Sequence, residues 1–472
     1  MSDRTRSEQG WLTDASRGGA GHAGFALSIA WSLSEPSRLA ESADLPAGRA
    51  SVLGRGGPQP DDRAVRVSFR RVRPGVRGPS QPLASPGVSR VQLRFSAPDA
   101  SGFEVESVGK SALFVDGVRT TRARVSVGSR LHVERQLLLL VVRAADELST
   151  RSAPPEFPFG EADAFGVVGE SSRAYALRDQ LAFLARRTGH VFVRGPSGAG
   201  KELCARALHA LSTRATGPFV SRNAATLPTG IIDAELFGNA RNYPNAGMRE
   251  RRGIVGEADG GTLFLDEIAE LPEELQAHLL RLLDSGEYHR LGDEASQRAD
   301  LRVVGATNRD EAALKHDLLA RFTLRIDVPG LDERVDDIPL IARAILRRHA
   351  RSDDELRRRF FDGDHPRIEP ALIEALLTRR YTTHVREVET MLLSSLAVSR
   401  GSFLALPAGT RRVEAGPAPG RGDVRPPPTR EQIEAELARN GGNVSQAWRD
   451  LGLSSRDALR RLMKKHEIAG RG

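Results

Sequence analysis

The sequence lacks the features of secreted and membrane proteins. Its single cysteine, Cys204, excludes any internal disulfide, which suits a reducing cytoplasm, and its place after a glycine-rich segment favours a buried helix residue over a nucleophile. The longest apolar run, Leu137 to Val142, is far shorter than the roughly 20 residues that span a bilayer. The polar, acid-containing start has no signal-peptide pattern. We therefore expect a soluble cytoplasmic protein without membrane contact.

Length and charge indicate several folded units and an anionic partner. The chain has 472 residues, too many for one ordinary core, and 39% hydrophobic residues, enough for separate globular units. The net charge of +8 favours an anionic partner. However, only five of the 69 basic residues are lysines, and this arginine-rich composition raises the sequence pI to about 10.1. Charge therefore supports other evidence but identifies no partner by itself.

A glycine-rich segment, Gly195 to Glu202, follows the apolar run His190 to Val193. Glycines let backbone N–H groups turn toward phosphate oxygens, Lys201 supplies a positive charge, and a helix that opens after the loop adds its positive end. Glu202 stands where a Ser or Thr usually holds Mg²⁺, so another carboxylate must hold the metal. The segment predicts nucleotide binding, although alone it also fits a glycine-rich turn. The predicted phosphate cradle is Gly195, Pro196, Ser197, Gly198, Ala199, Gly200, Lys201 and Glu202.

Two later apolar runs end in polar residues where a nucleotide-binding sheet should return. Gly260 to Leu265 reads as a strand followed by Asp266 and Glu267. Asp266 is suited to hold Mg²⁺ with its water shell, and Glu267 to orient or deprotonate the attacking water. Leu301 to Thr307 leads to Asn308, which could contact the γ-phosphate or the water. Together with the glycine-rich loop, these runs predict ATP hydrolysis with Mg²⁺ as cofactor.

The order of these motifs resembles the AAA+ domain of sigma-54-dependent enhancer-binding transcription regulators. The resemblance covers about half of the chain in unbroken order. It is carried by Phe165–Glu170, Gly200–Leu203, Asn223–Pro228, Glu235–Gly238, Gly260–Ile268 and Asp332–Leu340. That family also has Glu after its P-loop Lys, so the resemblance makes Glu202 compatible with ATP.

The resemblance also implies roles for further residues. Asn223 would switch Glu267, Asn308 would act as the first sensor, and Arg386 in Val385–Val388 would sense the γ-phosphate. The two finger positions are Lys315 and Arg321, which would reach the ATP of a neighbouring subunit. A finger supplied across an interface requires a ring, and the resemblance suggests a homohexamer.

One segment departs from the family pattern. The loop that presses on sigma-54 in the family, GAFTGA, corresponds by spacing to Asn242–Gly247, in which Pro244 replaces the Phe and Asn245 the Thr. Proline fixes one backbone angle and removes an N–H group. Two hypotheses therefore stay open: a regulator that remodels RNA polymerase with sigma-54, and a DNA-binding switch in which ATP only sets the oligomeric state.

The C-terminal segment predicts a second binding unit. After the Pro/Gly/Arg-rich stretch Gly409–Pro428, apolar residues at helical spacing and Gly452 indicate helices joined by a tight turn. The segment Gly442–Ser454 resembles a Fis-type DNA-binding domain. A basic helix is often only a solvated face, but its position behind an ATPase favours contact with double-stranded DNA. The expected DNA contacts are Ser455, Arg456, Arg460, Arg461 and Lys464.

The N-terminal region, Gly24 to Ala145, has short alternating apolar segments with Gly, Pro and Ser breaks, which predict an antiparallel β-sandwich. It resembles a forkhead-associated domain, in which Arg55, Ser89 and Arg90 would hold a phosphothreonine of a partner protein. Gln92 and Ser111 replace that family's His and Asn. The alternative is a sandwich that serves only for docking or oligomerisation.

We therefore expect a multidomain chain with an N-terminal β-sandwich, a central α/β P-loop AAA+ domain with an α-helical lid, and a C-terminal all-α helix-turn-helix. Its expected function is an ATP-dependent, DNA-binding transcription regulator with a phosphothreonine-type sensor. A scaffold with a vestigial ATPase is disfavoured because the catalytic set is complete. The expected divisions are a disordered start (1–23), the forkhead-associated-like sandwich (24–145), a linker (146–162), the ATPase core (163–333), its lid (334–408), a linker (409–428) and the Fis-type domain (429–472).

Overall fold

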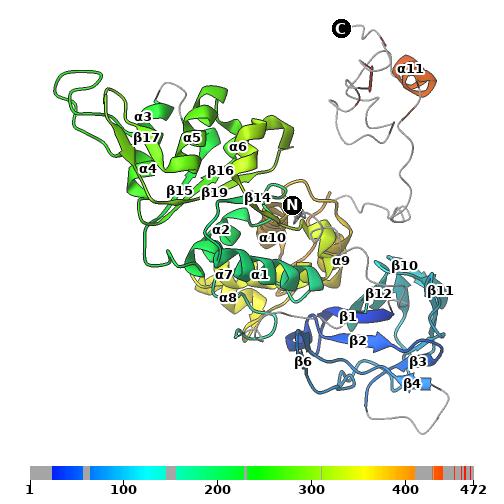
Figure 1. Cartoon of the computed structure of the whole chain (residues 1–472). Coiled ribbons are helices and arrows are strands. Elements are labelled where there is room, and N and C mark those ends of the chain that lie inside the picture. Colours follow the sequence, from blue (N-terminus) through cyan, green and yellow to red (C-terminus); the bar gives the residue numbers. More distant parts are fainter. Residues whose placement is uncertain are drawn as a thin grey trace, which may run out of the picture. The chain divides into compact units, whose positions relative to one another are not determined.

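The computed structural model describes residues 24–56, 64–144, 156–227, 231–309, 311–409, 428, 430–439, 451, 459, 462, 463 and 468. By its internal contacts the chain divides into two units, Met1–Glu414 and Ala415–Gly472, and each is described by itself (Figure 1). The first unit contains an N-terminal β-region, defined here as residues 24–144, followed by a mixed α/β region and a group of helices. Within the part of the chain that the structure describes, no helix is long and apolar enough to cross a membrane.

The β-region consists of two main sheets and one short hairpin. The six-stranded sheet has the order β10-β9-β12-β13-β1-β2 and the five-stranded sheet the order β11-β8-β7-β3-β4. Its strands are β1 (Phe25–Ser32), β2 (Ser42–Leu45), β3 (Ala50–Leu53), β4 (Ala64–Arg66), β7 (Leu93–Phe95), β8 (Phe103–Ser107), β9 (Leu113–Val115), β10 (Val118–Thr120), β11 (Arg122–Val125), β12 (Arg130–Val133) and β13 (Leu137–Arg143). The hairpin pairs β5 (Val72–Arg73) with β6 (Val76–Arg77).

Strand β13 is buried on both faces, which explains its unbroken apolar run. Leu139 packs into a core shared by the two sheets, with side chains such as Phe95 and Phe103. Leu138 and Leu140, which point to the opposite face because side chains alternate along a strand, belong to a second cluster that includes residues of the helices after the α/β region. An antiparallel sheet usually leaves one face exposed to water. In this sheet both faces of β13 are covered, because the second face packs against helices.

The α/β region is built on a five-stranded parallel sheet in the order β15-β16-β19-β14-β20. Its strands are β14 (Val191–Arg194), β15 (Phe219–Asn223), β16 (Thr262–Asp266), β19 (Arg302–Thr307) and β20 (Leu324–Asp327). The helices around it are α1 (Ser172–Ala185), α2 (Lys201–Ala210), α3 (Ile232–Phe237), α4 (Gly253–Glu257), α5 (Glu273–Ser285) and α6 (His316–Arg321), and a small hairpin pairs β17 (Glu287–His289) with β18 (Ser296–Arg298).

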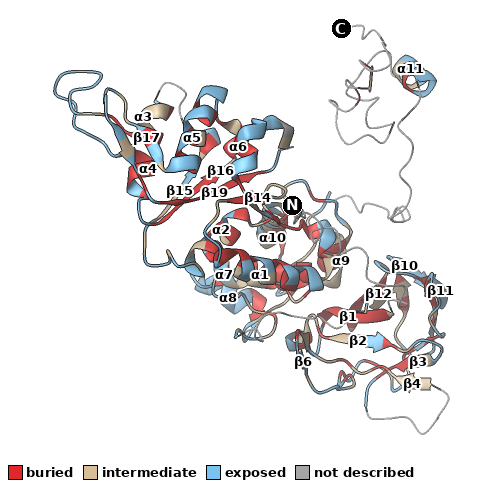
Figure 2. Cartoon of the chain, in the orientation of Figure 1, coloured by how far each residue is buried: buried red, intermediate tan, exposed pale blue. Residues whose placement is uncertain are grey.

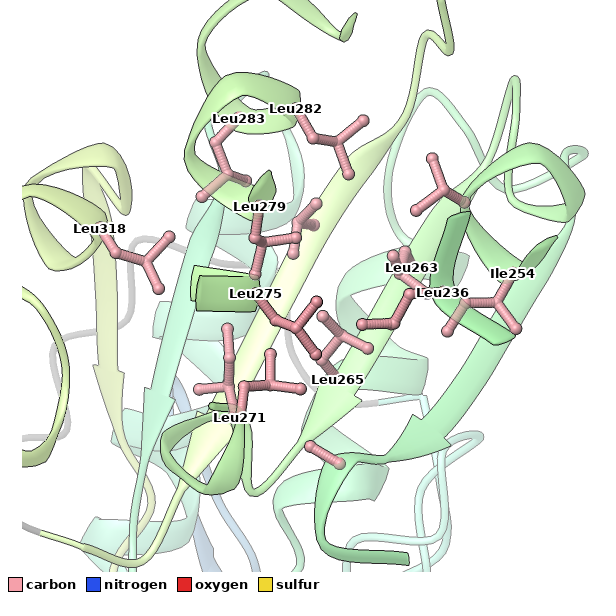
Figure 3. Close-up of a cluster of buried hydrophobic side chains, with 14 of the residues drawn as sticks. Leu236, Ile254, Leu263, Leu265, Leu271, Leu275, Leu279, Leu282, Leu283 and Leu318 are labelled. Carbon is pink, nitrogen blue, oxygen red and sulfur yellow. The ribbon is translucent and has the colours of Figure 1, made fainter. Parts of the chain in front are cut away.

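Both faces of this sheet are covered at its central strands, so β16 and β19 are almost entirely buried (Figure 2). On one face Leu263 and Leu265 of β16 pack with leucines of α3 and α5 and with Ile254 of α4 (Figure 3). On the other face Phe264 packs with residues of α1 and α2, among them Cys204. The strands of a parallel sheet end at one edge, and there the polar residues that follow β14, β16 and β19 gather.

A group of helices follows the sheet within residues 334–408, and it is called the lid here. It contains α7 (Ile338–Ala350), α8 (Asp354–Phe360), α9 (Pro370–Thr378) and α10 (Val385–Val398), with the short hairpin of β21 (Phe361–Asp362) and β22 (His365–Pro366). Their apolar faces share one cluster, which includes Leu346, Leu372 and Leu392. The lid helices begin after Asp337, whose carboxylate accepts hydrogen bonds from Glu170 N (2.7 Å) and Ser171 N (2.9 Å) before α1.

In the second unit the structure describes helix α11 (Arg430–Arg439) and a few further residues. Ile433, Leu459 and Met463 form a small core against which Leu437, Leu451 and Leu462 pack. The expected DNA contacts, Ser455, Arg456, Arg460, Arg461 and Lys464, lie outside the described residues.

Candidate functional site

The glycine-rich loop connects β14 to α2, and α2 begins at Lys201. Its glycines are required by geometry, because Gly198 (φ 72°) and Gly200 (φ 104°) adopt the left-handed conformation that side chains disfavour. A Cβ on Gly198 would also lie 2.2 Å from Thr383 O of the lid. The loop therefore turns tightly at the edge of the sheet and is in direct contact with the lid.

Lys201 points back over this loop toward the end of β16. Its side chain is 6% exposed, and its ammonium donates hydrogen bonds to Gly195 O (3.0 Å) and Pro196 O (3.4 Å). The same Nζ lies 3.7 Å from Glu267 Oε1. Glu202, by contrast, pairs with Arg206 one turn further along α2, at 2.8 Å. The structure thus joins the predicted phosphate ligand Lys201 to the predicted catalytic carboxylate.

The two acids that follow β16 differ in their surroundings. Burial raises the pKa of Asp266, the Lys201 ammonium partly opposes this, and the neighbouring Glu267 carboxylate adds to it. A half-buried carboxylate of this kind favours a cation beside it, so Asp266 fits the role of Mg²⁺ ligand. No group of three or more His, Cys, Asp and Glu gathers among the described residues, so water and phosphate oxygens would have to complete the coordination.

Glu267 is held in a strained backbone conformation and directed by its neighbours. Its φ of 51° is unusual for a residue other than glycine, and such strain is often found at functional sites. Its backbone N–H donates to Asp266 Oδ1 (3.0 Å), and its Oε2 accepts from Asn308 N (3.2 Å) after β19. Glu267 therefore lies between Lys201 and Asn308, as a base for water beside the γ-phosphate would.

Asn223 lies at the end of β15, directly across from Asp266 in the sheet. Its side-chain oxygen accepts a hydrogen bond from Ala225 N (2.9 Å). The structure thus places Asn223 on the strand next to Asp266, with its side chain engaged in a local turn. Its expected role as a switch for Glu267 stays a prediction.

The lid contributes Arg386 to the same site. Arg386 stands in the first turn of α10, and its Nη1 donates to Ser197 Oγ of the glycine-rich loop at 3.1 Å. The preceding residue, Val385, donates its backbone N–H to Gly198 O (3.3 Å). The predicted second sensor therefore contacts the phosphate loop directly.

The loop before α10 is held by Glu387, a residue that sequence analysis assigned no role. Its Oε1 accepts from Thr382 N (2.7 Å) and Thr383 N (2.6 Å), and its Oε2 from Arg379 Nε (3.0 Å). Burial raises the pKa of Glu387, but these hydrogen bonds outweigh that effect and lower it to about 2. Glu387 thus orders the segment Arg379–Thr383 before α10.

Arg334 is a second residue that sequence reasoning missed. Its side chain is buried, and its Nη2 donates to Ala199 O in the glycine-rich loop at 3.2 Å. Arg334 belongs to the Asp332–Leu340 motif, and this motif is the sequence signal that could have indicated it. No spacing rule relates that motif to the glycine-rich loop. Arg334 therefore ties the start of the lid to the phosphate cradle.

The two predicted finger residues lie at α6 and form pairs with α5. Arg321 Nε is 2.5 Å from Asp284 Oδ1, and Lys315 Nζ is 3.8 Å from Glu273 Oε2. Both side chains are about half exposed. The structure does not bring them together with Lys201 through any contact, and their exposure leaves them accessible to another molecule.

In the β-region the predicted phosphopeptide residues do come together. Arg55 N donates to Ser89 O (3.1 Å), and Ser89 Oγ accepts from Lys110 N (3.1 Å). Arg55 and Arg90 are exposed. Fully buried Gln92 accepts from Ser89 N (3.3 Å) and donates to Ser111 O (2.8 Å). Gln92 thus links the predicted loop to Ser111.

The segment Asn242–Gly247 is an exposed loop with an ordered base. Nδ2 of the buried Asn239 donates to Ala240 O (2.9 Å), Tyr243 O (3.2 Å) and Arg249 O (3.1 Å). The side chain of Tyr243 covers Gly292 of the β17–β18 hairpin so closely that a Cβ there would lie 2.4 Å from the ring. The loop is therefore exposed, with Tyr243 packed against the β17–β18 hairpin.

Comparisons with known proteins match the part of the chain that contains the glycine-rich loop and the acids at the end of β16. The model of the sigma-54 interaction domain matches residues 167–328, which include Lys201, Asp266, Glu267 and Asn308. The transcriptional regulatory protein ZraR of Salmonella typhimurium is 33% identical over 326 residues, 67% of this chain and 72% of ZraR. The Nif-specific regulatory protein of Bradyrhizobium diazoefficiens is 36% identical over 261 residues, 53% of this chain and 43% of that protein. A crystal structure of NtrX from Brucella abortus in complex with ATP is 30% identical and covers 64% of this chain and 69% of NtrX, with a TM-score of 0.46.

Proposed function

Because this chain belongs to the family of sigma-54-dependent transcriptional regulators, we propose that it hydrolyses ATP in a ring and uses the energy to act on RNA polymerase that carries sigma-54. One observation carries the proposal: Lys201, Glu267 and Asn308 meet at one sheet edge while Arg386 reaches the same loop from the lid. Each residue comes from a different element, so the shared position reflects the fold and not proximity in sequence.

The residues divide the chemistry as follows. The glycine-rich loop and Lys201 bind the phosphates, and Arg386 donates a hydrogen bond from the lid to Ser197 of the loop. Glu267 accepts the proton of the attacking water, and Asn308 holds the carboxylate in place. Asp266 would hold Mg²⁺, which would supply neutralisation of phosphate charge. The half-buried setting of Asp266 supports this assignment.

The exposed fingers support action in trans. Lys315 and Arg321 make surface pairs with α5, so they are free to exchange these partners for a phosphate of a neighbouring subunit. A finger that serves the next subunit makes the site complete only in a ring. We propose a homohexamer.

The terminal regions supply control and targeting in this proposal. The β-region would act as a forkhead-associated-like sandwich that binds phosphothreonine through Arg55, Ser89 and Arg90, with Lys110 next to Ser89 as a further cation. The C-terminal residues 429–472 would form a Fis-type helix-turn-helix on double-stranded DNA.

The phosphothreonine site can be tested directly by peptide binding. A phosphothreonine peptide library should bind the full chain, and the unphosphorylated library should not. Arg55→Ala should abolish binding, while Arg94→Ala, an exposed arginine of β7, should not. Equal binding of both libraries would instead favour the β-region as a docking or oligomerisation surface.

A second function is favoured by the loop at Asn242–Gly247. Pro244 and Asn245 stand where the family uses Phe and Thr, and Tyr243 is packed along the β17–β18 hairpin. In this alternative the chain is an ATP-switched DNA-binding regulator that changes its assembly state without remodelling sigma-54.

The deciding experiment is open-complex formation on a closed sigma-54 promoter. The full chain and ATP are added to RNA polymerase with sigma-54, and Lys201→Ala serves as the inactive control. Promoter melting that requires ATP and Lys201 would support remodelling. ATP hydrolysis and DNA binding without melting would reject remodelling in favour of the switch.

A further inference from the structure

A pocket of about 600 Å³ lies between the β-region and the lid. Its lining comes from β1, from β9, from β12 and the turn after it, and from the start of α9, and it shares no residue with the nucleotide site. Pockets that enclose small organic molecules have volumes of roughly 300–1,000 Å³. The space is therefore sufficient for a ligand with a ring system and a short side chain.

Three aromatic side chains line this pocket. They are Trp31 of β1, Phe114 of β9 and Phe403 after α10. The indole N–H of Trp31 donates to Ile368 O at 2.8 Å, so its one polar group is already paired. The faces of aromatic rings attract cations, those of Trp most strongly, and they also pack against other rings. These side chains therefore favour a ligand that combines a ring with a positive charge.

Carboxylates outnumber basic groups at the pocket. Its lining includes Glu134, Glu369 and Glu374 but only one arginine, Arg135, and one histidine, His132. Glu369 stands directly before α9, where its negative charge offsets the positive end of that helix. The charge of the lining therefore favours a cation over an anion.

His132 of β12 and Glu374 of α9 leave buried polar atoms without partners. His132 Nδ1 lies 3.0 Å from Glu374 Oε1, and the two side chains are 15% and 14% exposed. This contact lacks the alignment of a hydrogen bond, and within the described part of the chain neither Glu374 Oε1 nor His132 Nε2 has a hydrogen-bond partner. Buried polar atoms are nearly always paired in proteins, and a carboxylate only accepts hydrogen bonds. The pocket therefore lacks a hydrogen-bond donor at Glu374.

We propose that this pocket binds a small aromatic amine in its protonated form. The ammonium group donates to the Glu374 carboxylate, and the ring lies among Trp31, Phe114 and Phe403. An alkylammonium group carries both the positive charge and up to three N–H donors, so it meets the two requirements that the pocket sets. This inference goes beyond the proposed function, because it requires neither ATP hydrolysis nor contact with DNA or sigma-54.

The experiment compares three probes of nearly equal shape, each added to the full chain. Tryptamine carries an ammonium group, tryptophol a neutral hydroxyl and indole-3-acetate a carboxylate, all on the same ring system. At neutral pH the alkylamine is protonated. Calorimetric titration of each probe gives its dissociation constant, and the differences among the three isolate the effect of charge.

Two variants test whether the probes bind in this pocket. Glu374→Gln removes the negative charge while it keeps the shape of the side chain. Ala371→Phe places a ring in the pocket from the first turn of α9. The matched control is Glu355→Gln, which changes an exposed acid of α8 outside the pocket.

We expect tryptamine to bind with a dissociation constant of about 0.1 mM, within the range for ligands of this size. Its affinity should exceed that of tryptophol and of indole-3-acetate by at least about tenfold, as a hydrogen bond to a charged group provides. Glu374→Gln should lose this preference and still bind tryptophol, which shows that the pocket is intact. Ala371→Phe should weaken the binding of both probes, and the control should match the unmodified chain.

Equal or tighter binding of indole-3-acetate would overturn the proposal, because the pocket would then select anions through Arg135. A preference for tryptamine that persisted in Glu374→Gln would also reject it, as would unchanged tryptamine binding in Ala371→Phe, because the amine would then bind elsewhere. Absence of tryptamine binding to the unmodified chain would reject the site outright. Promoter melting and ATP hydrolysis test the proposed function separately, so either proposal can fail without the other.

Discussion

The backbone N–H of Asn308 donates a hydrogen bond to Glu267 Oε2 at 3.2 Å. The other oxygen of this carboxylate lies 3.7 Å from Nζ of Lys201. One carboxylate therefore connects residues that follow three adjacent strands, β14, β16 and β19. A change at the phosphate that Lys201 is proposed to bind would therefore affect Asn308, which follows β19, through Glu267.

Glu267→Gln should stop hydrolysis and preserve nucleotide binding. The amide has the same shape but does not take a proton from water, so we expect a fall in kcat of about 10²- to 10⁴-fold with little change in the dissociation constant for ATP. Phosphate release and equilibrium binding measure the two effects. Glu257→Gln, an exposed acid at the end of α4, is the control. An unchanged kcat would remove Glu267 from the catalytic role.

Arg321→Ala should reduce turnover without loss of nucleotide binding, because its side chain is half exposed and paired with Asp284 of α5. An arginine finger typically contributes about 10³- to 10⁵-fold in kcat. Mixing Arg321→Ala with Lys201→Ala subunits should restore part of the activity. In the mixture the intact Arg321 of a Lys201→Ala subunit can reach the intact nucleotide site of an Arg321→Ala subunit. Arg281→Ala, an exposed arginine of α5, should behave normally. Failure of the mixture to regain any activity would argue against action in trans.

Gly198→Ala should separate the lid from the phosphate loop. A Cβ at this position would lie 2.2 Å from Thr383 O, so the Arg386–Ser197 hydrogen bond should be lost and ATP affinity should fall by at least about tenfold. Gly363→Ala is a control for backbone strain alone, because Gly363 also has a positive φ (58°) but has open space around it. Its cost should be about 1 kcal/mol of stability, with ATP affinity unchanged. Equal ATP affinity in the two variants would contradict the steric argument.

Cys204 should be unreactive in the folded protein. Cys204 is a buried residue of α2. Burial raises the pKa of its thiol to about 12, so almost no thiolate is present at pH 8. A thiol reagent should therefore label the native chain at pH 8 only slowly, and rapidly after denaturation. Rapid labelling of the native chain would show that α2 opens readily.

Much of the ATP site is predictable because its signals are local. The glycine-rich loop and the pair Asp266 and Glu267 each occupy a few consecutive residues, and strand ends of a parallel sheet must meet at one edge. The family comparisons confirm a sigma-54 interaction domain over this region. The roles expected for Asn223 and the two fingers depend on motion or on a second subunit, and they stay predictions.

The contacts that sequence reasoning missed join residues far apart in the chain. Arg73 and Glu170 are 97 positions apart, and Arg334 and Ala199 are 135 apart, so no period or spacing relates them. The run Leu137–Val142 shows the same limit. Its unbroken apolar character indicates a strand buried on both faces, but only the fold shows that lid helices cover the second face.

Acid should weaken the lid through Glu387. The pKa of this carboxylate is lowered to about 2 by hydrogen bonds from Thr382, Thr383 and Arg379, which outweigh its partial burial. A carboxylate whose folded pKa lies below its unfolded value of about 4.3 stabilises the fold above that pH and loses this effect as pH falls toward 2. Glu387→Gln should therefore lower the melting temperature by a constant amount above about pH 5, and the difference should shrink between about pH 4.3 and pH 2. Glu355→Gln, which changes an exposed acid of α8, should show no such difference at either end of the range. A melting difference for Glu387→Gln that stayed constant down to pH 2 would mean that the hydrogen bonds from Thr382, Thr383 and Arg379 to Glu387 do not depend on the ionised carboxylate.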